Sequence, residues 1–264
     1  MTYFIAALLG VVQGLTEFLP ISSTAHLLVA ARLLGYEDPG GAFIVMIQLG
    51  SILAIVWLYR VKLAAVVRGL PSDRDSQRFA LMLLVAVVPA LVAGAFLAEY
   101  VQTVLYESVR VIAGALIAGG AVMLLVERFR PAPMVLDAER MSVSRAFGVG
   151  VCQVLSLVPG VSRSGATIVG GMLMRLDRPA AAEFSFFLAI PTMVAAFVYQ
   201  LMQVRADLGV DRAAEIAIGF VMAFIASAVV VKPFLSVVRR SGFAPFAWYR
   251  IAFGAGLLAM IPGD

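Results

Sequence analysis

Charged residues are scarce in this chain: Asp, Glu, Lys and Arg together make up 14% of its 264 residues. A soluble domain of average composition has about 25%. Hydrophobic residues make up 62% of the chain, and the mean hydropathy is +1.00. This composition excludes an ordinary soluble enzyme, a disordered protein and a fibrous protein. It favours an integral membrane protein with one polytopic domain over residues 1–264.

Cysteine and histidine are nearly absent. The single cysteine, Cys152, excludes a disulfide framework and a cysteine metal centre. His26 is the only histidine, so only one imidazole is available for catalysis. The net charge of +4 does not indicate nucleic-acid binding. No basic stretch precedes the first apolar run, so we expect the N-terminal segment to belong to the mature structure rather than to a cleaved signal.

Six segments are long, apolar and almost free of charge, and each is close to the ~20 residues that a membrane-spanning helix needs. No strand-like alternation accompanies them, so we predict six transmembrane helices. The segments are 42–59, 79–98, 110–127, 184–204, 214–232 and 244–262.

Two further apolar regions, 3–35 and 145–175, are each interrupted midway by a polar stretch that contains a proline. Each half is then too short to span a bilayer. Irregular backbone at membrane depth persists only where protein or a wet cavity satisfies its polar groups. We therefore predict two re-entrant helix–loop–helix pairs, which makes the chain an all-α membrane protein.

The two halves of the chain, about 1–130 and 141–264, repeat weakly at a spacing of 140 residues. Identical residues at this spacing are Gly10 and Gly150, Gln13 and Gln153, Leu15 and Leu155, Pro39 and Pro179, Ala42 and Ala182, Arg110 and Arg250, and Gly114 and Gly254. Each half contains three spans, which is an odd number. The sequence therefore predicts an inverted-topology repeat, with the two broken segments entering from opposite faces and meeting near the midplane.

The basic residues test this topology. If the loop at 60–78 is cytoplasmic, 14 of the 20 Lys and Arg residues lie on the cytoplasmic side. This distribution agrees with the positive-inside rule. Both termini are then expected outside the cell. Arg110 and Arg250 begin equivalent segments, and we expect them to be anchors that extend toward the membrane surface.

The first break gathers groups that suit metal binding and catalysis. Gln13 and Glu17 are four residues apart and share a helix face, and their oxygens suit a hard cation such as Mg²⁺ or Ca²⁺. Ser23 and His26 are three residues apart, a spacing typical of a nucleophile beside its base. Two plainer interpretations stay open: Glu17 pairs with Arg163 without a metal, or a serine caps the next helix and His26 is structural.

The second break places glycine, hydroxyl groups and one arginine directly before a helix. Exposed N–H groups at a helix N-terminus bind anions, and the Arg163 guanidinium adds a bidentate fork for phosphate. The alternative is a Gly/Ser kink with Arg163 paired to Glu17. Expected phosphate-binding residues are Arg163, Ser162, Ser164, Gly160, Thr167 and Ser22.

These two stretches carry a family resemblance. Residues 13–27 (QGLTEFLPISSTAHL) and 159–167 (PGVSRSGAT) resemble the two motifs of the undecaprenyl-pyrophosphate phosphatase family, the bacitracin-resistance type. That family has Glu or Gln at the position of Gln13. The glutamine leaves one carboxylate for a metal instead of two.

The resemblance implies hydrolysis of undecaprenyl pyrophosphate to undecaprenyl phosphate in the bacterial inner membrane, with a divalent cation. Recycling this lipid carrier supports peptidoglycan synthesis and bacitracin resistance. The expected catalytic residues are Glu17, Ser23, His26 and Arg163, and the expected metal ligands are Glu17 and Gln13. Ser23 is the expected nucleophile and His26 its base, with direct attack by water as the alternative. A lipid flippase or ion-coupled transporter is the rival function, and a homodimer is one option for assembly.

Overall fold

The computed structural model describes residues 2–38, 41–105, 108–204 and 212–260. The described residues are almost entirely helical, and the only strand-like feature among them is an isolated bridge between Val135 and Leu176. The α-helices are α1 (Thr2–Thr16), α2 (Ser23–Leu34), α3 (Ala42–Leu58), α4 (Arg60–Gly69), α5 (Arg74–Tyr100), α6 (Val109–Phe129), α7 (Val143–Val154), α8 (Arg163–Leu173), α9 (Arg178–Val204), α10 (Ala213–Ser241) and α11 (Ala244–Met260). Short helical turns lie at Val101–Leu105, Ala138–Arg140 and Leu155–Leu157.

Among the described residues, four helices are long and apolar enough to cross a membrane, namely α5, α6, α9 and α10. A fifth span is added if α3 and α4, which meet at a bend of 75°, are counted together. The sixth expected span corresponds to α11, which has 17 described residues. The all-helical membrane architecture is therefore confirmed, with four to five spans that pass this test of length and composition.

The outer surfaces of the long helices are apolar, as lipid contact requires. Phe96 on α5 is 83% exposed, and Leu84, Phe129 and Trp248 are also exposed. A soluble monomer rarely exposes so much apolar surface. These exposed apolar side chains are those expected of a protein whose sides face the lipid of a bilayer.

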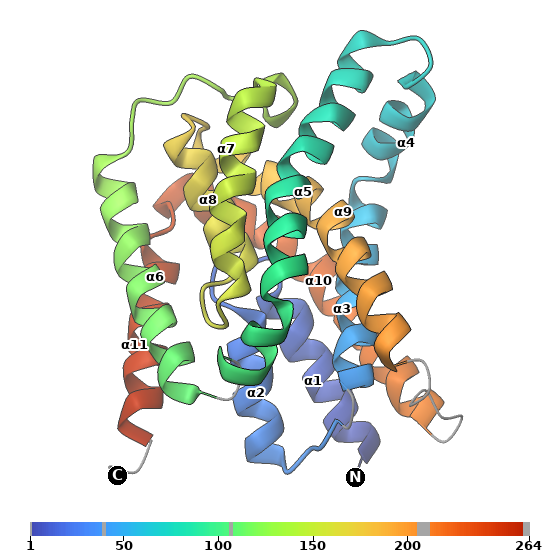
Figure 1. Ribbon diagram of the computed structural model, residues 1–264, viewed down its shortest axis with the longest axis vertical. Coiled ribbons are helices and arrows are strands. Elements are labelled where there is room, and N and C mark those ends of the chain that lie inside the picture. Colours follow the sequence, from blue (N-terminus) through green and yellow to red (C-terminus); the bar gives the residue numbers. More distant parts are fainter. Residues whose placement is uncertain (1, 39–40, 106–107, 205–211, 261–264) are drawn as a thin grey trace.

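Both broken regions form helical hairpins. The first hairpin, α1–α2, is interrupted at residues 17–22, and the second hairpin, α7–α8, is interrupted at 158–162. Figure 1 shows the first hairpin at the end of the molecule that holds both termini, and the second hairpin extending from the opposite end. Their turns, which we call the first tip (17–22) and the second tip (158–162), meet in the interior.

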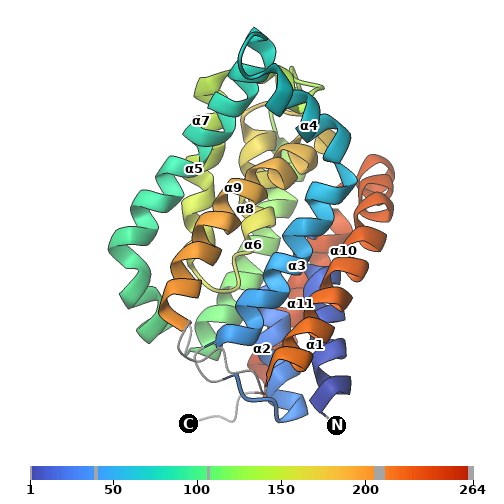
Figure 2. The same ribbon diagram turned by 90° about the vertical axis from the view of Figure 1, so that its right-hand side faces the viewer.

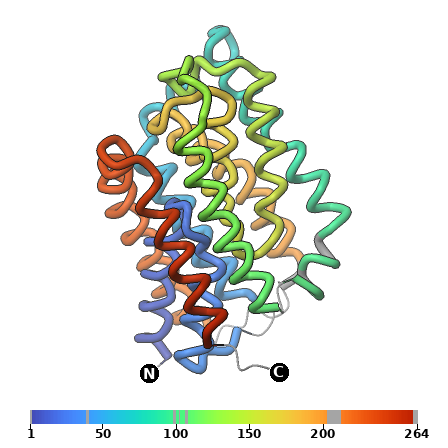
Figure 3. Tube along the Cα trace, turned by 90° about the vertical axis from the view of Figure 1, so that its left-hand side faces the viewer, coloured from blue at the N-terminus to red at the C-terminus, as the bar shows by residue number. Residues whose placement is uncertain are grey.

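Long helices enclose the two hairpins. Helix α1 packs against α10, and α10 packs against α3 (Figure 2). On the other side α11 runs along α6 (Figure 3). Polar contacts tie together the end of the molecule that holds both termini, because Arg212 pairs with Asp38 and Glu215 there. Burial raises the pKa of the neighbouring Tyr36 hydroxyl, and its hydrogen bond to Glu215 adds to this effect.

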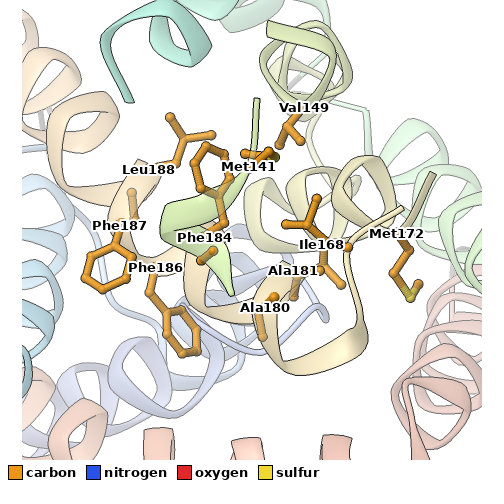
Figure 4. Packing of buried hydrophobic residues seen from close by; sticks show 14 of the residues in the cluster. Met141, Val149, Ile168, Met172, Ala180, Ala181, Phe184, Phe186, Phe187 and Leu188 are labelled. Carbon is orange, nitrogen blue, oxygen red and sulfur yellow. The ribbon is translucent and has the colours of Figure 1, made fainter. Parts of the chain in front are cut away.

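The largest apolar core lies around the first half of α9 (Figure 4). Phe184, Phe186 and Phe187 are each fully buried there. Phe18 of the first tip packs edge-to-face on Phe186, with ring centroids 5.5 Å apart. Aromatic pairs of this geometry stabilise packing beyond simple area burial. The core therefore holds the first tip against α9, which also carries contacts to the second hairpin.

Candidate active site

A cavity of about 120 Å³ lies where the two tips meet. It is bounded by both tips, the first turns of α2 and α8, and side chains of α3 and α9. The lining residues are Glu17, Ser22, Ser23, Thr24, Gln48, Ser156, Val158, Pro159, Gly160, Ser162, Arg163 and Met193. The two motifs, 146 residues apart at Glu17 and Arg163, are thus brought to one place.

Glu17 is the acceptor at the centre of the site. Its Oε2 accepts hydrogen bonds from Gln13 Nε2 at 3.0 Å and from Ser23 Oγ at 2.7 Å. Its Oε1 accepts from Arg163 Nη2 at 3.1 Å, which also forms an ion pair. The Glu17 and Arg163 side chains are only 5% and 12% exposed. A carboxylate so deeply buried requires such partners, because an unpaired charge there would be very costly.

Arg163 is held from two directions. Its Nη1 donates to the carbonyl oxygen of Ser185 at 2.9 Å and its Nη2 donates to Glu17. Its Nε is buried without a partner among the described residues. Thr167 Oγ1 lies 2.7 Å from Ser185 Oγ and so fastens α8 to α9 behind the guanidinium. The Arg163 guanidinium is therefore oriented by α9, while its Nε–H is left without an acceptor among the described residues.

Matching serine caps end both tips. Ser22 Oγ accepts from Ala25 N at 3.5 Å at the start of α2, and Ser162 Oγ accepts from Gly165 N at 3.1 Å at the start of α8. Both serines have positive φ, 71° and 73°, which is strained for a residue other than glycine. The turn lets both helices begin at the cavity. Their N-termini supply partial positive charge and N–H donors for an anion.

The predicted phosphate-binding residues divide into two groups. Arg163, Ser162, Gly160 and Ser22 line the cavity. Ser164 and Thr167 do not line it, because each is drawn into a structural contact. Ser164 Oγ donates to the Leu19 carbonyl oxygen at 2.8 Å and joins the two tips. Thr167 Oγ1 donates to the Arg163 carbonyl oxygen at 2.9 Å. The structure gives these two residues supporting positions instead of direct access to a ligand.

His26 does not form the predicted pair with Ser23. The Ser23 hydroxyl donates to Glu17 instead. His26 Nδ1 lies 2.8 Å from the Ser22 carbonyl oxygen, and a carbonyl only accepts, so Nδ1 carries the proton. Nε2 then accepts from the Tyr249 hydroxyl at 2.7 Å. The imidazole also stacks on Phe253, with centroids 4.4 Å apart, so its basic nitrogen faces α11.

The residues present fit a divalent cation to a limited degree. No cluster of three or more His, Cys, Asp or Glu side chains occurs in the part of the chain that the structure describes. Gln13 is fully buried, and its Oε1 has no hydrogen-bond partner within the described ranges. This free amide oxygen shares a side chain with the Nε2 that contacts Glu17. Carboxylate and amide oxygens are ligands for Mg²⁺ or Ca²⁺, so the chain offers two donors.

Several residues of the site were not expected from the sequence. Gln48 of α3 lines the cavity, and Ser185 of α9 positions Arg163. The expectation that Arg250 is a surface anchor is wrong: it is 1% exposed and donates to backbone oxygens of both tips. Arg110, its equivalent at the spacing of 140, is exposed. An arginine inside an apolar segment was itself the available signal, since such residues are functional candidates by default.

Comparison with known proteins extends the motif resemblance to the whole chain. Residues 6–256 match the family model described as bacitracin resistance protein BacA. The chain is 53% identical over 257 residues to undecaprenyl-diphosphatase 2 of Paramagnetospirillum magneticum, covering 97% of this chain and 98% of that protein. It is 49% identical over 257 residues to undecaprenyl-diphosphatase 1 of Agrobacterium fabrum, covering 97% and 96%. These matches confirm the family resemblance that the two motifs indicated.

Proposed function

The chain belongs to the bacitracin resistance protein BacA family, and from this premise we propose that it hydrolyses undecaprenyl diphosphate to undecaprenyl phosphate and inorganic phosphate. It is a multi-pass protein of the bacterial inner membrane, where this reaction recycles the lipid carrier of peptidoglycan synthesis. One observation carries the proposal. A carboxylate, a hydroxyl and a guanidinium are hydrogen-bonded in series where two helix N-termini meet at one cavity.

Phosphate binding is assigned to the N-termini of α2 and α8 and to Arg163. A terminal phosphate in the cavity would face both positive helix ends. It would compete with Glu17 for the Arg163 fork, and the unpartnered Nε of that guanidinium supplies a further donor. Stabilisation of charge on the phosphate oxygens is the main catalytic task in phosphoryl transfer.

For the chemical step we propose Ser23 as the nucleophile. Its Oγ would form a bond to the terminal phosphorus while the bond to the bridging oxygen breaks and undecaprenyl phosphate leaves. The Ser23 proton would pass to Glu17, to which the hydroxyl already donates at 2.7 Å. Water would then attack the phosphoserine, release phosphate and restore the Ser23 proton from Glu17. Glu17 replaces His26 as the base in this scheme, because the basic nitrogen of His26 faces Tyr249.

Direct attack by a water that Glu17 activates is the alternative route. Trapping with labelled substrate separates the two. A phosphoenzyme that forms in the wild type and in Thr24→Ala, and is absent in Ser23→Ala, supports the covalent route. Full turnover in Ser23→Ala would exclude it. Thr24 is a matched control because it is the next hydroxyl along α2 and also lines the cavity.

We also propose a divalent cation, Mg²⁺ or Ca²⁺, held by Glu17 and by the free Oε1 of Gln13. When bound, such an ion offsets the negative charge of pyrophosphate oxygens. Gln13→Leu removes the amide oxygen and the donor to Glu17. We expect this variant to need a higher metal concentration for half-maximal activity. An unchanged metal requirement would remove Gln13 from the ligand set.

For the topology we propose six spans in two inverted repeats, 1–130 and 141–264, with both termini outside. The opposite approach of the two hairpins and the equivalent caps at Ser22 and Ser162 support this arrangement. In a Cys152→Ala background, an impermeant maleimide should label Glu37→Cys in intact spheroplasts. It should label Ser72→Cys only after permeabilisation. The reverse pattern would overturn the orientation.

A transporter is the second candidate, favoured by broken helices that meet inside the membrane. The deciding measurement is phosphate release from a long-chain prenyl diphosphate by purified protein, with and without Mg²⁺ or Ca²⁺. Release that requires metal and is lost in Arg163→Ala supports the phosphatase. Flux of the lipid in liposomes without release would instead identify a transporter. A homodimer stays a prediction, which light scattering of the purified protein tests.

A further inference from the structure

We propose that Arg250 is a positioning residue that holds the two tips in register, so that Glu17 and Ser23 of one hairpin face Arg163 of the other. The inference rests on the proposed phosphatase function. Arg250 lies on α11, outside both hairpins and outside both sequence motifs. It is one of the largest fully buried side chains in the described structure.

The guanidinium of Arg250 bridges three parts of the chain. Nη1 donates to the carbonyl oxygen of Pro20 in the first tip at 3.2 Å. Nη2 donates to the carbonyl oxygen of Gly160 in the second tip at 3.1 Å. The remaining bonds go to the α6 carbonyl oxygens of Ala115 at 3.2 Å and Leu116 at 3.4 Å. One rigid group thus ties both tips to the α6–α11 pair.

Direct links between the tips are few, which makes this bridge significant. Ser164 Oγ donates to the Leu19 carbonyl oxygen, and Arg163 pairs with Glu17. The second of these is the contact that a bound phosphate would disturb. Within the described part of the chain, the hydrogen bonds of Arg250 all go to main-chain oxygens. Its attachment to both tips therefore does not depend on whether the cavity is filled.

Small residues make room for the guanidinium. A Cβ added at Gly165, in the first turn of α8, would lie 2.7 Å from Arg250 Nη1. A Cβ at Gly119 of α6 would collide with Nη2. Larger side chains at either position would displace Arg250 from the carbonyl oxygens. The glycines of α6 and α8 therefore leave the space that the Arg250 guanidinium fills.

The positive charge of Arg250 also affects the electrostatics of the site. Arg250 takes part in none of the ion pairs formed among the described residues, whereas Arg163 is paired with Glu17. Glu17, Arg163 and Arg250 together therefore leave one positive charge next to the tips. A positive site at membrane depth favours an anionic ligand such as a diphosphate.

Lysine cannot replace this function. Its ammonium is one compact group at the end of a flexible stem, whereas the guanidinium presents donors in a planar fork. A single Nζ cannot reach Pro20, Gly160, Ala115 and Leu116 together. Arg250→Lys therefore keeps the positive charge but no longer holds the two tips in register. Arg250→Met loses both the charge and this alignment.

The test compares these variants with Arg110→Lys and Arg110→Met, the matched positions at the spacing of 140. We expect kcat for prenyl diphosphate hydrolysis to fall about 100-fold in Arg250→Lys, with KM within about threefold of the wild type. Arg250→Met should lose more, and the Arg110 variants should match the wild type. A wild-type kcat in Arg250→Lys would overturn the proposal, because charge alone would then suffice. An unchanged kcat in Arg250→Met, with only a lower melting temperature, would reduce Arg250 to a structural role.

Hydrogen exchange provides a readout that does not depend on activity. Peptides that cover residues 17–22 and 158–162 should exchange faster in Arg250→Lys than in the wild type. Peptides of the core around Phe184 should be unchanged. Unaltered exchange at both tips would overturn the proposal. If no protein in the series releases phosphate while the tips still loosen, the proposed function fails and the positioning role stands.

Discussion

The α1–α2 hairpin and the α7–α8 hairpin share a backbone design but differ in chemistry. Each is interrupted by a polar turn and restarts at a serine with φ near 70°. The first hairpin brings the Glu17 carboxylate and the Ser23 hydroxyl that we propose as the nucleophile, while the second hairpin brings the Arg163 guanidinium. Neither hairpin carries a complete site. The comparison teaches that the shared backbone aims two helix ends at one cavity, and that the side chains divide the chemistry between them.

The two hairpins also differ in how firmly they are held. Eight of the eleven residues of α8 are buried, whereas only Ala25 and Leu27 are buried in α2. Helix α8 is fastened to α9 through Thr167 and Ser185. Helix α2 makes its polar contact to the rest of the fold through His26 and the half-exposed Tyr249. The second hairpin is therefore the fixed side of the site, and the first is the side with less support.

The strongest way to break the comparison is to remove the carboxylate of the first tip. Glu17→Gln takes away the proposed base and the partner of three donors at once. We expect phosphate release to fall at least about 1,000-fold. Adding Arg163→Gln should cost little more, because residues that act as one unit are not additive.

The double mutant tests whether Glu17 and Arg163 act together as one catalytic unit. If the losses of Glu17→Gln and Arg163→Gln add, the two tips act independently and the comparison fails. Each protein must first be shown to be folded by size-exclusion chromatography. This check is needed because breaking a buried ion pair destabilises by about 3–5 kcal/mol.

Substituting each of the two capping serines sharpens the comparison, because the loss of folding stability shows how firmly each helix start is held. Ser162→Ala keeps the strained φ and leaves Gly165 N without its acceptor, so we expect a loss of about 1–2 kcal/mol. Ser162→Gly should lose less, since glycine adopts positive φ without strain. Thermal unfolding in detergent measures both.

The same pair of changes at Ser22 should have smaller effects. Its Oγ accepts at 3.5 Å instead of 3.1 Å, and Ser162 also contacts Ser164 Oγ at 3.0 Å. Equal losses at the two caps would show that the hairpins are held equally firmly. That result would contradict the burial difference between α2 and α8.

Much of this arrangement could be predicted from the sequence. Apolar length located every long helix among the described residues, and the polar runs around Pro20 and Pro159 marked the interruptions. Proline alone did not mark them, because Pro89, Pro191 and Pro233 lie inside α5, α9 and α10. The meeting of Glu17 and Arg163 followed from two polar motifs in a membrane segment. These are local properties of composition and spacing.

What could not be predicted depends on long-range partners. His26 turns away from Ser23 because the Ser22 carbonyl oxygen holds Nδ1 and Tyr249, 223 residues away, holds Nε2. Arg250 looked like a surface anchor because it and Arg110 begin equivalent apolar segments in the repeat. Its burial follows from α11 packing along α6 next to the tips. Spacing along one helix does not contain such information.

A smaller effect is expected where the less supported hairpin meets α11. Tyr249→Phe removes the donor to His26 Nε2 but keeps the stacked ring. We expect turnover to fall no more than about tenfold, in line with one neutral hydrogen bond. Tyr3→Phe, at an exposed position of α1, is the control. A loss as large as that of Ser23→Ala would return His26 to the chemical step.

The smallest effect is expected at an exposed helix cap, which serves as a reference for the buried caps at the two tips. Asp73 lies before α5 in an exposed turn and accepts from the Ser76 hydroxyl and from Ser76 N. These hydrogen bonds lower the pKa of its carboxyl from the ordinary value of 3.8. The ionised form therefore stabilises the fold above the unfolded pKa, and this contribution is lost as the pH falls through the lowered folded pKa. Asp73→Asn should lower the melting temperature slightly at pH 7 and make no difference once Asp73 itself is protonated. The stability that the Asp73 cap contributes is thus lost at low pH. Ser22 and Ser162 carry no charge, so the stability that they contribute should be the same across this pH range.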